Sequence, residues 1–231
     1  MELIKFLYGK MQRQWMKLRL QPIWVYCMHH VSASYDAESM DIEDWMQIDE
    51  FKNKVQSMRR EGVVFISLTD AYNKMKNDKF RIRKFGVLTF DDGYASLKEI
   101  LPWLEEQQIP ATLFVNGKYL DGKSYRRNPK EQYLTKDELF ALTSPLIEIG
   151  SHGWEHVNAM YMSNQELIDS INNTKDILSS HPRFVPFHAY AYGKRKLEMD
   201  QVLRNIGMTP VIHRCHVNYN NPDLVDRMPL M

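Results

Sequence analysis

Two adjacent carboxylates, Asp91 and Asp92, end an apolar run and are followed by Gly93. Residues 86–90 before them have the composition of a short buried strand, and Asp-Asp-Gly is typical of a chain leaving a strand end. Successive side chains diverge at such a point, so the two carboxylates can have different roles in one pocket. A solvated Asp-Gly turn is the commoner alternative for this pattern.

Two histidines, His152 and His156, stand four residues apart after a second apolar segment that ends at Gly150. Their imidazoles can turn to one point if the residues between them make one turn of chain. A carboxylate from another strand end would complete a two-His, one-Asp site for a divalent cation. Imidazole with carboxylate suits zinc, and also iron, cobalt or nickel. Together with the Asp pair, this spacing predicts a metal site.

A hydrolytic site needs a base and an acid besides a Lewis acid. If Asp92 binds the cation, Asp91 is left in the right place to take a proton from water. A histidine with a pKa near neutrality is the natural proton donor to the leaving group. The candidates are the histidines His29, His30, His188, His213 and His216, of which the last three are expected to have structural roles.

Strand and helix patterns alternate along the chain and predict parallel strands joined by crossover helices, an α/β fold. Apolar runs predict strands at 22–28, 63–68, 86–90, 111–115, 146–149, 184–192 and 210–217. About seven strands favour a barrel over an open sheet, with catalytic residues at the C-terminal strand ends. Both motifs stand at such ends. No linker divides residues 21–231, which are predicted to form a single domain.

Four helix starts carry sequence signals. Capping boxes are predicted at Thr135–Glu138 and at Ser163–Glu166. Asp49 is the expected cap of a helix that ends near Gly62, and Thr69 or Asp70 that of the next. The helices therefore fall between the predicted strands, as an α/β barrel requires.

The composition excludes several classes of protein. The chain has 231 residues, 44% of them apolar, and a formal net charge of +1, which argues against binding of nucleic acid. Cys27 and Cys215 lie far apart and do not resemble a disulfide framework. No stretch reaches the roughly eighteen continuous apolar residues of a membrane span.

The first twenty residues mix five basic residues and one acidic residue with apolar ones. We interpret residues 1–20 as an N-terminal helical extension packed on the domain. The alternative is a basic amphipathic helix in peripheral contact with a membrane. Basic residues interrupt each candidate apolar core of a signal peptide, so a cytoplasmic location is expected, with membrane association through residues 1–20 as the variant.

The motifs resemble a known family. Thr89-Phe-Asp-Asp-Gly93 and Ser151-His-x-x-x-His156 are similar to the two signatures of the polysaccharide deacetylases, the NodB-homology enzymes of carbohydrate esterase family 4. The resemblance implies a distorted (β/α)7 barrel and metal-dependent removal of an acetyl group, usually from an N-acetylated sugar. It implies that Asp91 is the base and that the metal ligands, with zinc the first choice of metal, are Asp92, His152 and His156.

Two further segments resemble parts of the same family. Residues 27–32, Cys-Met-His-His-Val-Ser, are similar to the early Tyr-His-x-Val segment of the permuted branch that deacetylates poly-N-acetylglucosamine. This implies that His29 is the general acid, with Met28 in place of Tyr. Residues 187–193 resemble an aromatic-Pro-Tyr-Gly stretch whose Tyr backbone N–H faces the oxyanion. Tyr192 would be that residue, or would simply pack in the core, and Ala191 replaces the Pro.

Other functions compete with deacetylation. His152-x-x-Glu155-His156 also fits the H-x-x-E-H motif of zinc peptidases, but that motif needs a continuous helix and Gly153 lies within it. A non-catalytic sugar-binding relative is the second alternative, left open by Ala191 and Met28. The expected substrate is an acetylated oligo- or polysaccharide, or a glycan precursor met inside the cell during cell-surface polysaccharide biosynthesis. A pairing of Arg227 with Asp91 is a further hypothesis.

Overall fold

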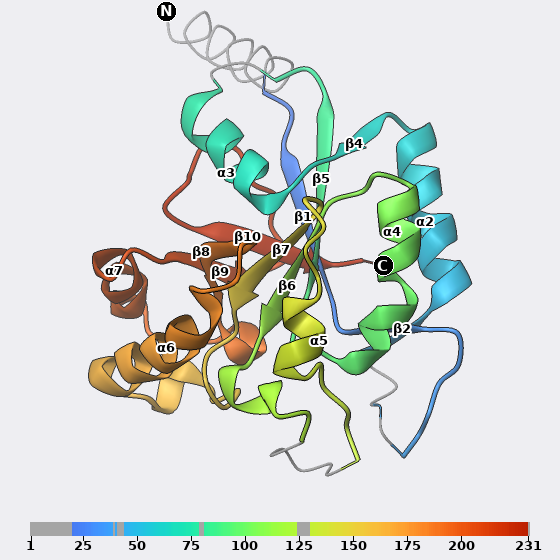
Figure 1. Ribbon diagram of the computed structural model, residues 1–231. Helices are drawn as coiled ribbons and strands as arrows, with labels where there is room; N and C mark the ends of the chain where they lie inside the picture. Colours follow the sequence, from blue (N-terminus) through green and yellow to red (C-terminus); the bar gives the residue numbers. More distant parts are fainter. Residues whose placement is uncertain (1–19, 39, 41–43, 79–80, 124–129, 231) are drawn as a thin grey trace, which may run out of the picture.

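The computed structural model describes residues 20–38, 40, 44–78, 81–123 and 130–230, and its centre is a parallel β-sheet (Figure 1). The sheet strands are β1 (Ile23–Met28), β4 (Val63–Phe65), β5 (Lys84–Phe90), β6 (Ala111–Val115), β7 (Ile147–Ser151), β8 (Phe184–Ala189), β9 (Thr209–His213) and β10 (Val225–Pro229). Two short strands, β2 (His30–Ser32) and β3 (Trp45–Gln47), pair separately.

The sheet closes on itself through β1. This strand pairs with β5 along one edge, from Ile23 opposite Phe85 to Met28 opposite Phe90, and with β10 along the other. The ring is therefore β1-β5-β6-β7-β8-β9-β10, and β4 extends the sheet outside it by pairing with β5. The predicted distorted (β/α)7 barrel is confirmed, and parallel closure brings the C-terminal strand ends to one mouth.

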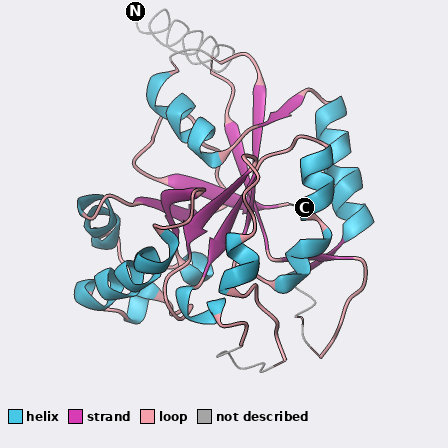
Figure 2. Cartoon of the chain, viewed as in Figure 1, coloured by secondary structure: helices cyan, strands magenta, loops and turns pink. Residues whose placement is uncertain are grey.

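Helices surround the strands, as Figure 2 shows. They are α2 (Ile48–Arg60), α3 (Leu68–Asn77), α4 (Leu101–Glu106), α5 (Lys136–Phe140), α6 (Asn164–Leu178) and α7 (Glu198–Asn205). In the part of the chain that the structure describes, four 3-10 turns lie between them: η2 (Ala95–Glu99), η3 (Gly117–Leu120), η4 (Ala159–Tyr161) and η5 (Ala191–Gly193). No helix in the described ranges is long and apolar enough to cross a membrane.

The period of two along a strand decides which side chains enter the barrel. Val87 on β5 and Val225 on β10 belong to one buried apolar cluster, together with residues of β1, β6, β8 and β9. The next residues on the same faces are polar: Thr89 and then Asp91 after Val87, and Arg227 after Val225. The interior of the barrel is thus apolar below and becomes charged toward the mouth.

The opposite end of the barrel is closed by α3. Leu68 and Met75 of this helix join the interior cluster, and the carboxylate of Glu148 on β7 accepts hydrogen bonds from the backbone N–H of Leu68 and of Thr69. A buried carboxylate at a helix N-terminus is stabilised by these orphan donors and by the helix dipole. The site is consequently open to solvent from the mouth.

Element boundaries differ from the sequence expectations where a local signal misleads. Both capping boxes are present, but α2 is capped by Gln47 rather than Asp49, and α3 by Ser67 rather than Thr69 or Asp70. The predicted strand 63–68 ends at Phe65, and β7 continues through Gly150 to Ser151. Strand β10 was not predicted, because its Asp, Arg and Pro conceal the strand pattern.

The predicted helical extension lies outside the described residues except for Leu20, which bridges to Arg81. Its role and the location of the protein in the cell stay predictions.

Candidate active site

A cavity of about 230 Å³ opens among the C-terminal strand ends. Every site residue predicted from the sequence lines it, which is where a parallel barrel places its active site. The full lining is Cys27, His29, Asp44, Asp91, Asp92, His152, His156, Tyr192, Gly193, His213 and Arg227.

The three predicted metal ligands meet at one wall of the cavity. Asp92 Oδ1 lies 3.4 Å from His152 Nε2 and 3.2 Å from His156 Nε2, and all three residues are buried. Ligands of a tetrahedral zinc, each at about 2.0–2.1 Å, stand roughly 3.3 Å apart. The spacing of these donor atoms therefore fits a zinc-sized cation.

The protonation of His152 supports the same conclusion. Its Nδ1 lies 2.8 Å from the Ala189 carbonyl oxygen, which can only accept, so Nδ1 carries the proton. In the neutral ring, Nε2 then presents a lone pair toward the Asp92 carboxylate. Two acceptors that face each other in a buried site are reconciled by a proton or a metal cation between them, and a second hydrogen bond that orients the ring is the usual partner of a metal-ligating histidine.

The backbone around these ligands adopts strained conformations. Asp92 and His156 have left-handed φ values of 69° and 53°, which non-glycine residues seldom adopt. Gly93 follows in the same region at 76°, and a Cβ there would lie 2.9 Å from Val115 Cγ1. The left-handed turn at Asp92 breaks the strand alternation, so that Asp91 and Asp92 both face the cavity. Such strain clusters at functional sites because the surroundings must hold it.

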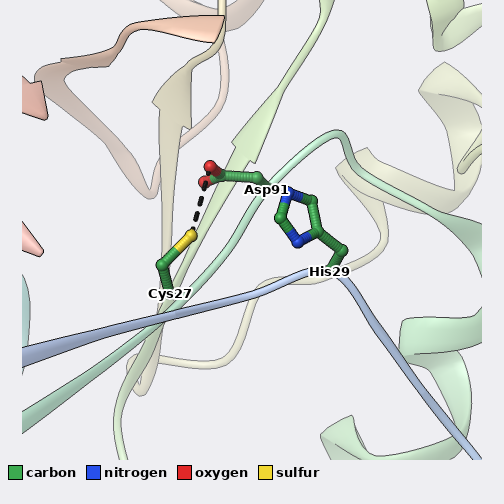
Figure 3. Close-up of side chains that lie close together, drawn as sticks. All are labelled: Cys27, His29 and Asp91. Atoms are coloured by element: carbon green, nitrogen blue, oxygen red, sulfur yellow. Dashed lines mark hydrogen bonds between the residues drawn. The ribbon is translucent and has the colours of Figure 1, made fainter. Parts of the chain in front are cut away.

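Asp91 is held by a buried, two-pronged ion pair. Arg227 Nη1 donates to its Oδ1 at 2.6 Å and Nη2 to its Oδ2 at 2.7 Å, which confirms the hypothesised pairing. The Cys27 thiol also donates to Oδ2, at 3.4 Å (Figure 3). Burial alone would raise the pKa of Asp91, but the charge and hydrogen bonds of Arg227, together with His152 and His29, outweigh burial and hold that pKa well below its usual range. Asp91 is thus ionised at neutral pH.

Arg227 is itself anchored inside the barrel. Its Nη1 donates to Thr89 Oγ1 at 3.1 Å, and that hydroxyl donates to the Tyr26 carbonyl at 2.8 Å. The guanidinium carbon lies 5.3 Å from the ring centroid of Phe114. These contacts fix the guanidinium, and through it the carboxylate of Asp91.

The predicted acid, His29, lines the same cavity. It follows β1 directly, and its Nδ1 lies 3.4 Å from Asp44 Oδ1. Asp44 was not singled out from the sequence, where it is one acid in an acidic loop. The signal that could have found it is chemical, since a histidine that donates protons from one ring nitrogen is commonly oriented by a carboxylate at the other.

Tyr192 lies at the rim. Its side chain is 60% exposed, its ring centroid lies 4.6 Å from that of His156, and its φ is 59°. Core packing is therefore the wrong interpretation for Tyr192, whereas the nearby Tyr190 is buried. The η5 turn closes through a hydrogen bond from Gly193 N–H to the Tyr190 carbonyl at 2.9 Å. This turn fixes the backbone of Tyr192 beside the cavity.

The family model described as polysaccharide deacetylase matches residues 78–211. The chain belongs to the polysaccharide deacetylase family. Members are hydrolases of acetylated carbohydrate, and the matched segment holds the Asp pair and both histidines of the predicted metal site. His29, Asp44 and Arg227 lie outside it. No curated protein sequence matches the chain significantly.

Solved structures extend the similarity of fold to nearly the whole deacetylase. IcaB from Ammonifex degensii is 20% identical with a TM-score of 0.78, covering 92% of this chain and 93% of IcaB. The deacetylase PplD of Streptococcus pyogenes, solved with acetate, is 19% identical with a TM-score of 0.74, and the match covers 91% of this chain and 92% of PplD. A de-N-acetylase of Aggregatibacter actinomycetemcomitans is 18% identical with a TM-score of 0.69, and the match covers 90% of this chain and 94% of the de-N-acetylase. These likenesses show a common barrel.

The peptidase alternative lacks its geometry in this deacetylase. Residues 152–156 form no helix, and Glu155 does not line the cavity. Instead its carboxylate pairs with Lys118 Nζ at 2.5 Å, with both side chains partly exposed. Glu155 is consequently not placed to act on a substrate that binds near Asp92.

Of the other candidate histidines, two are buried in structural contacts, one is exposed and one lines the site. His30 stacks on Tyr94 at 3.6 Å, and His188 Nδ1 lies 3.2 Å from Ser151 Oγ. Burial, followed by the charges of neighbouring groups, lowers the pKa of His188 to about 3, so it is neutral. His216 is exposed near Asp226. His213, expected to be structural, lines the cavity instead.

Proposed function

We propose that this protein is a divalent-metal-dependent deacetylase that hydrolyses an N-acetyl group of an acetylated oligo- or polysaccharide or of its glycan precursor. The observation that carries the proposal is the meeting, in one cavity, of a buried Asp-His-His donor set with an ionised carboxylate beside it. A non-catalytic sugar-binding protein would not need both groups.

The cation would be held by Asp92, His152 and His156. When bound, it supplies Lewis acidity, polarising the acetyl carbonyl and lowering the pKa of water. Zinc suits this donor set, with cobalt, nickel and iron as alternatives. The deep burial of the three side chains keeps the local dielectric low, which strengthens the electrostatic stabilisation of charge that develops on the substrate.

The protein groups divide the proton transfers between them. Asp91 accepts the proton of the water that attacks the acetyl carbon, because Arg227 keeps it ionised and fixed. His29, oriented by Asp44, donates a proton to the departing amine nitrogen. The backbone N–H of Tyr192 stabilises the oxyanion from the rim, and the exposed ring of that residue borders the space that the sugar would occupy.

Acetate release tests the proposal directly. The purified chain, loaded with zinc or cobalt, is incubated with N-acetylated and O-acetylated oligosaccharides, and free acetate is measured. We expect release from an N-acetylated glycan, loss on chelation, and a drop of about 10²–10⁴-fold in Asp91→Asn with its metal content retained. Asp169→Asn, on the exposed face of α6, is the matched control and should keep full activity. Failure of the loaded enzyme to release acetate from any acetylated glycan would contradict the proposal.

A further inference from the structure

A second group of metal-ligating atoms lies beside the Asp92 site. Ligand atoms of Cys27, His29 and Asp91 all lie within 4.8 Å of one another. Figure 3 shows the three side chains converging, two from the end of β1 and one from the end of β5. All three line the cavity, so a solute that enters the mouth reaches them.

We propose that Cys27, His29 and Asp91 form a separate, inhibitory site for a thiophilic divalent cation such as Zn²⁺ or Cd²⁺. A thiolate, an imidazole and a carboxylate are all ligands that zinc accepts, and the sulfur sets this site apart from the sulfur-free site at Asp92. Binding itself does not depend on the function proposed above, whereas the inhibitory effect does.

The distance between sulfur and oxygen suits such a cation. Cys27 Sγ lies 3.4 Å from Asp91 Oδ2, with the thiol proton between them. A tetrahedral zinc with a Zn–S bond of about 2.3 Å and a Zn–O bond of about 2.0 Å separates the two ligand atoms by roughly 3.5 Å. The cation can therefore replace the proton with little movement: the S–H bond breaks, the proton passes to the buffer, and a metal–sulfur bond forms.

Arg227 limits the affinity of this site without blocking it. Its two N–H donors take one lone pair on each oxygen of Asp91. A carboxylate offers about four lone-pair positions, so Oδ2 keeps one for the cation once the thiol proton has left. The guanidinium and a cation at Asp92 both repel a second cation. The Cys27 site therefore fills after the first one and binds more weakly.

Occupation of this site would stop the reaction at two points. A cation bound to Oδ2 makes Asp91 a weaker base, because its positive charge disfavours protonation of the carboxylate. It also takes a ring nitrogen of His29; because Nδ1 of that ring faces Asp44, the nitrogen available is Nε2. One cation thus weakens the base and occupies the acid. An enzyme that needs one zinc ion would be inhibited by a second.

Cadmium titration tests the proposal, because a cadmium–thiolate bond absorbs in the ultraviolet. The test uses the Cys215→Ser protein, since Cys215 is an exposed thiol that would also bind cadmium. The protein is first given one equivalent of zinc and is then titrated with Cd²⁺ while absorbance and acetate release are recorded. We expect a saturable absorbance and a parallel loss of activity. Cadmium that exchanges into the Asp92 site contributes no absorbance, because no sulfur lies there.

The matched controls are Cys27→Ser and Cys27→Ala in the Cys215→Ser background, so that one of them serves if the other does not fold. Both should lack the absorbance, and half-inhibition should need at least about tenfold more Cd²⁺. Mg²⁺, a hard cation, should produce neither effect. No absorbance in the Cys215→Ser protein, or equal inhibition with and without Cys27, would overturn the proposal. If the protein releases no acetate at all, the absorbance alone still decides whether the site binds.

Discussion

The proposed base and the proposed acid line one cavity in contrasting surroundings. The side chains of Asp91 and Arg227 are 5% and 1% exposed, whereas those of His29 and Asp44 are 29% and 34% exposed. Asp91 and Arg227 stand at barrel strands, while His29 and Asp44 lie in connections outside the ring. The comparison indicates that the barrel fixes the proposed base and the proposed metal ligands, and that loops hold the proposed acid.

The largest effect should come from the barrel side, at the metal ligands. Asp92→Ala removes the carboxylate that both imidazoles face, so we expect loss of bound metal and of several kcal/mol of transition-state stabilisation, at least about a thousandfold in acetate release. Metal analysis and the acetate assay measure both. Glu155→Ala is the control within the same segment. If Glu155→Ala lost its metal while Asp92→Ala kept its metal, the peptidase interpretation would be restored.

Breaking the buried ion pair should destabilise the fold. Arg227→Leu leaves the Asp91 carboxylate buried without its partner, at a cost of about 3–5 kcal/mol of unfolding free energy. Urea denaturation measures the change. The double variant Asp91→Asn/Arg227→Leu has no buried charge at this point and should recover part of the loss. Equal stability of the single variant and the wild type would show that the pair is not held as the structure has it.

Low pH should also reduce the stability that the buried Asp91 contributes. The pKa of Asp91 in the folded protein lies below the value of about 3.9 for an unfolded chain. Its contribution to stability is therefore complete above that pH and is lost as the pH falls below it toward the folded pKa. Asp91→Asn should flatten the dependence of unfolding free energy on pH below about 4. An unchanged slope in this variant would contradict the assigned direction of the shift.

Substitutions of the loop residues His29 and Asp44 should change the reaction rate rather than the stability of the fold. Asp44→Asn weakens the partner of His29, and we expect kcat to fall about tenfold with little change in KM, because general acid catalysis depends on orientation. Its side chain is 34% exposed, and pairs of this kind contribute only about 0–1 kcal/mol to folding. His29→Gln should cost more than Asp44→Asn. A large loss of stability in Asp44→Asn would remove the contrast between the two sides.

The smallest effect is expected at the rim. Ala191 stands where the family pattern has Pro, and the preceding Tyr190 already has extended angles of −72° and 128°, which suit a residue before Pro. Ala191→Pro should therefore stabilise the fold by about 0.4–1 kcal/mol by restricting the unfolded chain. Thermal unfolding measures it, with acetate release as the check on Tyr192. Destabilisation by Ala191→Pro would show that the η5 turn does not accept a proline ring.

Local sequence signals were enough to predict the chemical groups of the site and most of the helices and strands. The strands before Asp91 and His152 could be predicted because each is a short apolar run that ends in turn residues, and the capping boxes at Thr135 and Ser163 were confirmed because all their atoms lie within one turn. The caps Gln47 and Ser67 were missed because neighbouring acidic or hydroxyl residues offered the same signal two or three positions later.

The sequence by itself determined which groups can bind a metal and move protons: Asp91, Asp92, His152, His156 and His29 are all marked by motifs of a few residues. Only the tertiary structure decided how they are held. Arg227 reaches Asp91 across 136 positions of sequence, and Asp44 approaches His29 from a separate loop. Such contacts depend on strand register and on closure of the ring between β1 and β10. Because register is set by the packing of the whole sheet, no local pattern encodes it.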